Sequence, residues 1–449
     1  MSPNSAITRS DTVLPESTIL NISSPTSLVR SFQDQEKVFS SAFAILRDAI
    51  DQRAFPAASV AVTQAGNLIA RKAFGHFVYE ENSGGASRPG APRPGAPLLA
   101  AFARSGDFDS PVTPETLFDL ASVTKVIATT TMAAFLYERG LLELDTPVAG
   151  TVPEFLADAC GELDPRRRDV TFRMLLAHSS GLPAYEKLFL KAKSREDLLR
   201  AAFTMPLSSD PGTKAEYSDI GFIILGAALE RLAEDSLDAF CQREIFGPLA
   251  MAHTTFNPSP DMRPKTTPTA DERDREECGA DTPVRQTPAV PVQPSVSQER
   301  STFRHRVIQG EVQDENAYVL GGVAGHAGLF STAEDVARFA HAMLQGGHPI
   351  LRPATVGTFT RRESAPAGTS RAIGWDTPSV PSQSGKYFSP RSFGHLGYTG
   401  TSLWIDPERQ LSVALLTNRT WPDCSNRAIK EVRPRFHDAI VAALVLPGT

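Results

Sequence analysis

Two residues, Ser122 and Lys125, lie three positions apart in the largely apolar stretch 118–139, and this pair can perform acyl transfer. Residues three apart share one face of a helix, so the spacing predicts that hydroxyl and amine point the same way. A helix N-terminus favours negative charge, and a lysine whose pKa is lowered by burial can take the serine proton. The same pattern is equally typical of a capping serine and a surface lysine. By itself it does not decide the function.

A second polar group, Tyr217-Ser218-Asp219, comes directly before an apolar helical stretch. If Tyr217 lies beside Lys125, its phenol could exist partly as phenolate and act as general base toward Ser122. The alternative is an aromatic residue that only closes the fold.

A third group is glycine-rich: residues 394–401 read Gly-His-Leu-Gly-Tyr-Thr-Gly-Thr and precede Trp404. Glycines within a strand often mark a close approach to the backbone. A strand beside Ser122 could lend one backbone N–H to an oxyanion hole, with the N–H of Ser122 as the other. A β-bulge is the alternative interpretation.

In this order the three groups resemble the serine β-lactamase and penicillin-binding-protein superfamily, whose signatures are S-x-x-K, S-D-N and K-T-G. The resemblance is strongest to its class C-like branch, which includes family VIII carboxylesterases and D-aminopeptidase-like enzymes. That branch has Y-x-N as second motif and often H-x-G or W-x-G as third. Further phrases that look like family signatures are FDLASVTK, LELDTPV, LLAHSSGLP and GHAGLFSTAEDVARF. The resemblance implies a β-lactamase/transpeptidase-like α+β fold over about residues 36–445, apart from two inserts at 82–97 and 271–304.

The resemblance also implies a role for each motif residue. Ser122 would be the nucleophile, Lys125 would help to deprotonate it, and Tyr217 would be the general base. His395 stands where the third motif has its lysine, and the backbone N–H groups of Ser122 and Tyr398 would form the oxyanion hole. The reaction would be acyl transfer to water through an acyl-enzyme, and no metal or organic cofactor is implied.

Two departures from the family pattern concern substrate binding. Asp219 replaces an asparagine and so removes an NH2 donor, while Leu396 replaces a hydroxyl residue. His395 is a less reliable cation than lysine. Asp219, His395 and Gly397 are the expected substrate contacts, and the changes weaken recognition of a β-lactam carboxylate and amide. Simple esters need neither the carboxylate contact nor the amide contact, so the changes favour a carboxylesterase. Such an enzyme could also hydrolyse β-lactams promiscuously.

Two alternatives remain beside the esterase. One is a β-lactamase or a peptidase acting on D-amino-acid peptides, and the other is a penicillin-binding-like module without turnover. Among the other polar residues, His178 and His326 are expected to be structural. Residues 311–316 could reach the rim of the cleft, but the sequence indicates no role for them.

The elements that must position these motifs come from both ends of the chain. Apolar spacing predicts a helix over about 36–53, two strands within 57–75, a hairpin over 401–418 and a last helix over about 425–445. Neither end has enough strands for a sheet of its own, so both must share one antiparallel sheet. The residues between them are then expected to form a mostly helical lobe.

The domain organisation predicted is a flexible leader, residues 1–33, followed by one hydrolase domain, residues 34–449. Segments 82–97 and 271–304, rich in proline, glycine or charge, are expected to be flexible inserts.

Composition narrows the choice of partners. A formal net charge of −6 argues against nucleic acid, and no apolar run is long enough to span a membrane. The expected partner is a small ester or β-lactam, and no oligomeric state is indicated. Without a visible signal peptide, a cytoplasmic location is expected, with atypical export left open. The four cysteines are expected to be reduced.

Overall fold

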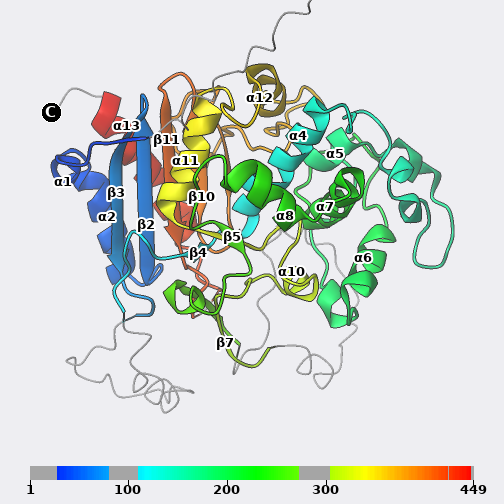
Figure 1. Ribbon diagram of the computed structural model, residues 1–449, viewed down its shortest axis with the longest axis horizontal. Helices are drawn as coiled ribbons and strands as arrows, with labels where there is room; N and C mark the ends of the chain where they lie inside the picture. The colour runs from blue at the N-terminus through cyan, green and yellow to red at the C-terminus, as the bar shows by residue number, and fades with distance from the viewer. Residues whose placement is uncertain (1–27, 80–109, 273–303, 423, 446–449) are drawn as a thin grey trace, which may run out of the picture.

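A six-stranded sheet built from both ends of the chain is the main support of the molecule (Figure 1). The computed structural model describes residues 28–79, 110–272, 304–422 and 424–445. The strand order is β1-β3-β2-β11-β10-β9. Their bounds are Val29–Arg30 (β1), Ala57–Gln64 (β2), Asn67–Gly75 (β3), Phe393–Leu396 (β9), Ser402–Asp406 (β10) and Leu411–Thr417 (β11).

The pairing of β2 with β11 joins the two ends, with Val60 opposite Leu415. This confirms the sheet expected from the sequence. The expectation of a wholly antiparallel sheet is wrong at one edge, since β1 runs parallel to β3. Val29 and Arg30 belong to the expected leader, so its last residues are attached to the sheet; residues 1–27 lie outside the described residues.

Helices cover both faces of this sheet (Figure 1). Helices α2 (Ser40–Asp51) and α13 (Ile429–Val445) pack on one face, and α11 (Ala333–Leu344) packs on the other. Because both faces are covered, β2 and β11 are buried almost throughout and show no polar alternation. Phe43 and Leu46 of α2 are fully buried, as their helical spacing predicts.

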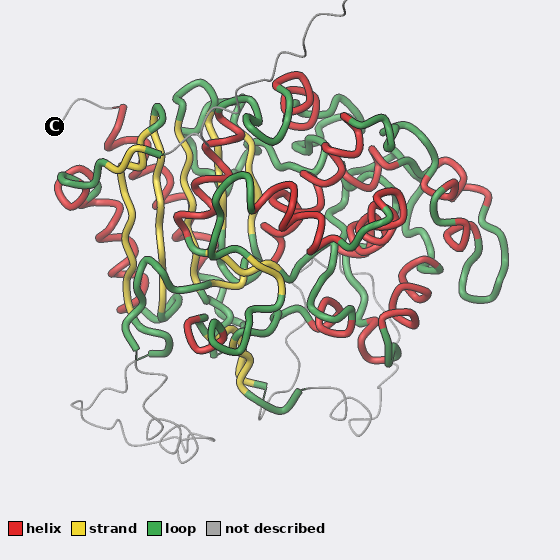
Figure 2. Tube along the Cα trace, viewed as in Figure 1, coloured by secondary structure: helices red, strands yellow, loops and turns green. Residues whose placement is uncertain are grey.

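The middle of the chain forms the helical lobe beside the sheet (Figure 2). Its main helices are α4 (Thr131–Glu138), α5 (Phe172–Leu176), α6 (Arg195–Phe203), α7 (Asp219–Ala233), α8 (Leu237–Cys241), α10 (Glu315–Val319) and α12 (Pro353–Thr360). Short strands link the parts: β4 (Phe118–Asp119) and β5 (Thr255–Phe256) flank β8 (Leu329–Ser331), and β6 (Pro268–Asp271) pairs with β7 (Val307–Gln309). The α+β expectation is confirmed.

The two expected inserts lie outside the described residues, except for 271, 272 and 304 at the ends of the second. Arg304 and Glu272, which flank that gap, form a buried ion pair with Nη2 and Oε1 2.6 Å apart. Arg304 also donates to the carbonyl oxygens of Val312 and Gln313. Arg304 therefore links Glu272 to the chain segment just before Asp314.

The oxidation state of one cysteine differs from the expectation. Cys160 and Cys241 are free thiols, whereas Cys424 is disulfide-bonded. Its oxidation contradicts the expectation of four reduced thiols. Within the described ranges, none of the helices has the length and apolar character needed to cross a bilayer.

Candidate active site

The segment that carries Ser122 is not one regular helix. After β4 the chain makes a 3₁₀ turn, Ala121–Val123, then a π-helical stretch, Lys125–Thr130, and only then α4. Ala121 has φ +46°, a left-handed conformation that is uncommon for a residue with a side chain. Ser122 lies in the 3₁₀ turn and Lys125 begins the π-helical stretch, and across this junction the two side chains meet as their spacing predicted.

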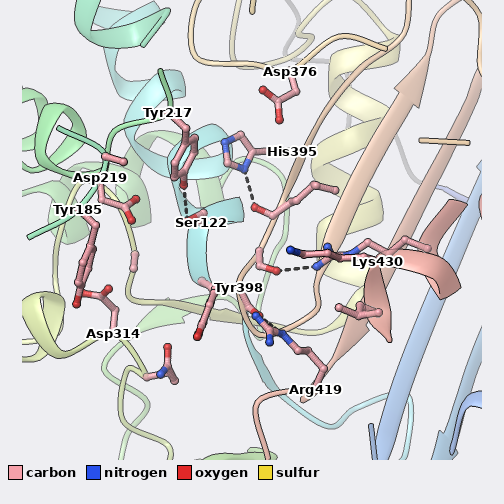
Figure 3. Close-up of a pocket in the computed structure, with 18 of the residues that line it drawn as sticks. Ser122, Tyr185, Tyr217, Asp219, Asp314, Asp376, His395, Tyr398, Arg419 and Lys430 are labelled. Carbon is pink, nitrogen blue, oxygen red and sulfur yellow. Dashed lines mark hydrogen bonds between the residues drawn. The ribbon is translucent and has the colours of Figure 1, made fainter. Parts of the chain in front are cut away.

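The Ser122 hydroxyl lies between two polar side chains, those of Lys125 and Tyr217, and Figure 3 shows the hydrogen bond from Tyr217. Lys125 Nζ is 3.0 Å from Ser122 Oγ, and the Tyr217 hydroxyl donates to the same oxygen at 2.7 Å. Tyr217 is 95 residues away in sequence. The structure therefore places the first two motifs in contact.

Lys125 is fully buried and has a carboxylate partner. Its Nζ lies 2.6 Å from Asp219 Oδ1 and donates to the carbonyl oxygen of His326 at 2.8 Å. Burial lowers the pKa of Lys125, and the charge of Asp219 opposes that shift. Asp219 lines the pocket, as expected of a substrate contact, but one of its oxygens is engaged by the lysine.

Tyr217 carries its proton in this site. Burial raises the pKa of its phenol well above the usual value, and the nearby Asp219 carboxylate adds to the shift. Both effects favour the protonated phenol over the partly ionised form suggested by the sequence. Two neighbours contact the ring: His178 packs against it in a tilted arrangement with centroids 4.7 Å apart, and Arg371 lies with its guanidinium carbon 5.5 Å from its centroid.

The two histidines outside the motifs make structural contacts, as expected. The ring Nδ1 of His178 accepts from the backbone N–H of Ser218 at 3.1 Å. His326 Nε2 lies 2.8 Å from Asp314 Oδ1 while its carbonyl oxygen holds Lys125. Both residues thereby order the chain around the Ser122 site.

His395, in the position of the third-motif lysine, is uncharged. Burial lowers its pKa to about 3, and the positive charges of Lys125 and Arg371 act in the same direction. Its Nδ1–H donates to the Leu396 carbonyl oxygen at 2.8 Å. At neutral pH the third motif therefore brings no cation to the pocket through His395.

The turn after β9 packs against the backbone just before Ser122. The Thr399 and Thr401 hydroxyls donate to the carbonyl oxygens of Asp119 and Leu120, at 2.7 and 2.9 Å. A side chain at Gly397 would collide with the Leu120 carbonyl, so this glycine permits the close approach that its position in the sequence suggested. The turn brings Tyr398 into the pocket of Ser122.

These residues line one pocket of about 300 Å³ (Figure 3). It contains every site residue expected from the sequence except the buried Lys125, which lies beneath it. Sequence reasoning missed several lining residues, which are Tyr185, Arg371, Asp376, Arg419, Lys430 and Arg433. None of these belongs to a recognisable motif. Asp314 and Glu315 come from the segment 311–316, to which the sequence assigned no role.

Charge is distributed unevenly around the pocket. Asp219 and Asp314 line it on the lobe side, whereas Arg419 and Lys430 lie across from them (Figure 3). Within the described part of the chain, no group of three or more His, Cys, Asp or Glu residues is arranged to hold a metal ion.

Comparison with known proteins assigns the chain to a family. The sequence profile of the Beta-lactamase family matches residues 42–432. The chain belongs to the Beta-lactamase family. Within the surrounding superfamily of β-lactamases and penicillin-binding proteins, it is a serine hydrolase.

Curated relatives of this Beta-lactamase family member are named as an amidase and as putative carboxypeptidases. The chain is 31% identical over 383 residues to "N-acetylmuramyl-L-alanine amidase" of Bacillus subtilis (strain 168), covering 81% of this chain and 77% of the relative. It is 30% identical over 353 residues to "Putative D-alanyl-D-alanine carboxypeptidase" of Salmonella agona (strain SL483), covering 75% of each.

Solved structures share the fold at low sequence identity. "EstCE1, a hydrolase with promiscuous acyltransferase activity" superposes with a TM-score of 0.64 at 20% identity, over 91% of this chain and 99% of that one. A penicillin-binding protein homologue from Caulobacter crescentus gives 0.63 at 16% identity, over 92% and 98%. These likenesses show the β-lactamase/transpeptidase-like fold.

Proposed function

We propose that the protein hydrolyses carboxylic esters through an acyl-enzyme on Ser122. The observation that carries this proposal is the position of Ser122 Oγ, 3.0 Å from Lys125 Nζ and 2.7 Å from the Tyr217 hydroxyl, in a pocket large enough for a small ester. An amine with a lowered pKa beside a serine is the arrangement that activates such a nucleophile.

The acylation step follows from the protonation states. Lys125 takes the proton of the Ser122 hydroxyl as Oγ bonds to the ester carbonyl carbon, and the backbone N–H groups of Ser122 and Tyr398 receive the oxyanion. The bond to the leaving alkoxide then breaks, and Tyr217 gives the alkoxide its phenolic proton. The proton held by Lys125 restores the phenol.

Deacylation repeats the sequence with water as nucleophile. A water molecule loses a proton to the same Lys125 and Tyr217 pair as its oxygen bonds to the acyl carbon. The acyl–Oγ bond breaks, Ser122 Oγ recovers a proton, and the carboxylic acid departs. The net reaction is hydrolysis of one ester by one water.

Two contacts favour an ester over a β-lactam. Asp219 offers acceptors and no NH2 donor, and one of its oxygens is held by Lys125. His395 is neutral and Leu396 is apolar, so this part of the third motif offers little to a substrate carboxylate. Slow turnover of cephalosporins remains expected, because the acylating groups are the same.

A second candidate is hydrolysis of peptides that end in a carboxylate. The observation that favours it is the wall formed by Arg419 and Lys430 (Figure 3), since cations suit a terminal carboxylate. The names of the amidase and carboxypeptidase relatives are compatible with this candidate.

The test is steady-state hydrolysis of p-nitrophenyl butyrate, nitrocefin and a peptide ending in D-alanyl-D-alanine, measured side by side. Ester turnover should exceed the other two, and Ser122→Ala should reduce it by about 10⁴-fold or more. Ser379→Ala, an exposed serine outside the pocket, is the matched control and should retain full activity.

Other outcomes separate the alternatives. Dominant peptide or nitrocefin turnover would replace the esterase by a carboxypeptidase or a β-lactamase. Ester turnover that survives in Ser122→Ala would refute the acyl-enzyme. A folded protein whose Ser122 does not react with a fluorophosphonate probe would instead be a recognition module.

A further inference from the structure

The environment of Tyr217 contains a cation that none of the three motifs supplies. Two basic side chains lie against the ring: Lys125, with Nζ 5.0 Å from the centroid, and Arg371, with its guanidinium carbon 5.5 Å away. Lys125 is engaged by Asp219 on its other side. Arg371 therefore contributes a positive charge that is independent of the Lys125–Asp219 pair.

Arg371 is held in place by backbone and side-chain contacts. Its side chain is 19% exposed and ion-pairs with Asp376. The backbone N–H groups of Asp376 and Gly394 donate to each other's carbonyl oxygens at 2.9 Å. The pair is thus fixed to β9 next to His395, and the guanidinium is directed at the pocket.

The remaining titratable groups around the phenol carry no positive charge at neutral pH. Burial lowers the pKa of both His178 and His395. The Asp219 carboxylate raises the pKa of Tyr217, and Arg371 acts in the opposite direction. The third-motif position that holds a lysine in K-T-G enzymes is thus neutral here.

We propose that Arg371 takes the electrostatic place of the missing third-motif lysine, by stabilising the Tyr217 phenolate that forms as the tyrosine gives its proton to the leaving group. Arg371 acts through Tyr217 and is a positioning residue. The inference rests on the proposed acyl transfer and adds to it the cation that leaving-group protonation requires.

This role has a signature that a merely structural arginine lacks. A p-nitrophenolate leaves without a proton, whereas an alkoxide must be protonated as its bond breaks. Loss of Arg371 should therefore impair alkyl esters far more than p-nitrophenyl esters of the same acid. A general distortion of the pocket would impair both alike.

The experiment compares kcat/KM for ethyl butyrate and p-nitrophenyl butyrate in the full-length protein. Arg371→Met should lose about 100-fold on the ethyl ester and only a few-fold on the p-nitrophenyl ester, while Arg371→Lys should recover most of the ethyl ester activity. Arg362→Met is the matched control: Arg362 binds the Thr377 hydroxyl and the Pro378 carbonyl outside the pocket and should change neither rate.

Equal losses on the two esters, or no loss on either, would overturn the inference while leaving the esterase in place. A wild-type protein without Ser122-dependent hydrolysis of either ester would remove both proposals. If Arg371→Met does not fold, Arg371→Gln gives the same comparison, and a Gln variant with equal losses on both esters counts against the proposal.

Discussion

Lys125 Nζ and Asp219 Oδ1 lie 2.6 Å apart beneath the candidate nucleophile, and the two residues are 94 positions apart in sequence. The position of Asp219 corresponds to the asparagine of the Y-x-N motif. A carboxylate there changes the site in two ways: it removes an amide donor from the pocket, and it brings a negative charge to the lysine.

Asp219→Asn should move the acidic limb of the pH–kcat/KM profile to lower pH. Asp219 raises the pKa of Lys125 against the effect of burial, so its removal lowers that pKa and keeps the amine neutral at lower pH. The profile should be measured with p-nitrophenyl butyrate between pH 4 and 8.

Asp145→Asn is the control for this shift, because Asp145 pairs with Arg173 outside the pocket. It should leave the acidic limb in place. A limb that does not move in Asp219→Asn, or that moves to higher pH, would show that Lys125 is not the group that must lose its proton.

Thr401→Val should lower kcat by about 10- to 100-fold with little change in KM. The Thr401 hydroxyl donates to the Leu120 carbonyl and ties the turn that carries Tyr398 to the backbone before Ser122. Misplacing one oxyanion donor is felt mainly in the transition state, where losses of this order are expected. Steady-state kinetics with p-nitrophenyl butyrate separates kcat from KM.

Thr63→Val provides the comparison for that variant. Thr63 is equally buried and its hydroxyl lies 2.6 Å from that of Ser412, in the sheet and outside the pocket. Thr63→Val should lower the free energy of unfolding about as much as Thr401→Val does, and it should leave kcat unchanged. A similar fall in kcat in both variants would attribute the effect of Thr401 to stability alone.

Acid should destabilise the protein through histidines that are buried uncharged. Burial lowers the pKa of His437 to about 3, whereas an unfolded histidine titrates near 6.5. As pH falls below about 6.5 the unfolded state binds the proton first, so this contribution to stability is complete above pH 6.5 and is lost progressively toward pH 3. Each such histidine contributes a slope of about 1.4 kcal/mol per pH unit in that window.

Urea unfolding at several pH values between 4 and 7 measures this slope. His437→Gln should reduce it by the contribution of one histidine, and the exposed His348→Gln should not change it. An identical slope in wild type and His437→Gln would mean that His437 is protonated in the folded protein.

The sequence alone determined the framework and the identity of the central groups. Helical spacing of Phe43 and Leu46 and the apolar strands at both ends predicted the shared sheet, because periodicity reports which faces must be buried. The order of Ser122, Lys125 and Tyr217 along the chain predicted the contact that the structure shows. Residue types and their spacing are enough to predict a feature when a motif and its neighbours in sequence determine it.

Only the tertiary structure decided the charges of the site. The protonation of Tyr217 and His395 depends on burial and on charges brought from distant segments, and no local pattern encodes either. Arg371 illustrates the same limit: nothing in its neighbourhood of the sequence marks it, and its place over the Tyr217 ring arises when the loop before β9 packs against the lobe. Sequence motifs identify the reacting residues. Their protonation states depend on charges brought close only in the folded chain.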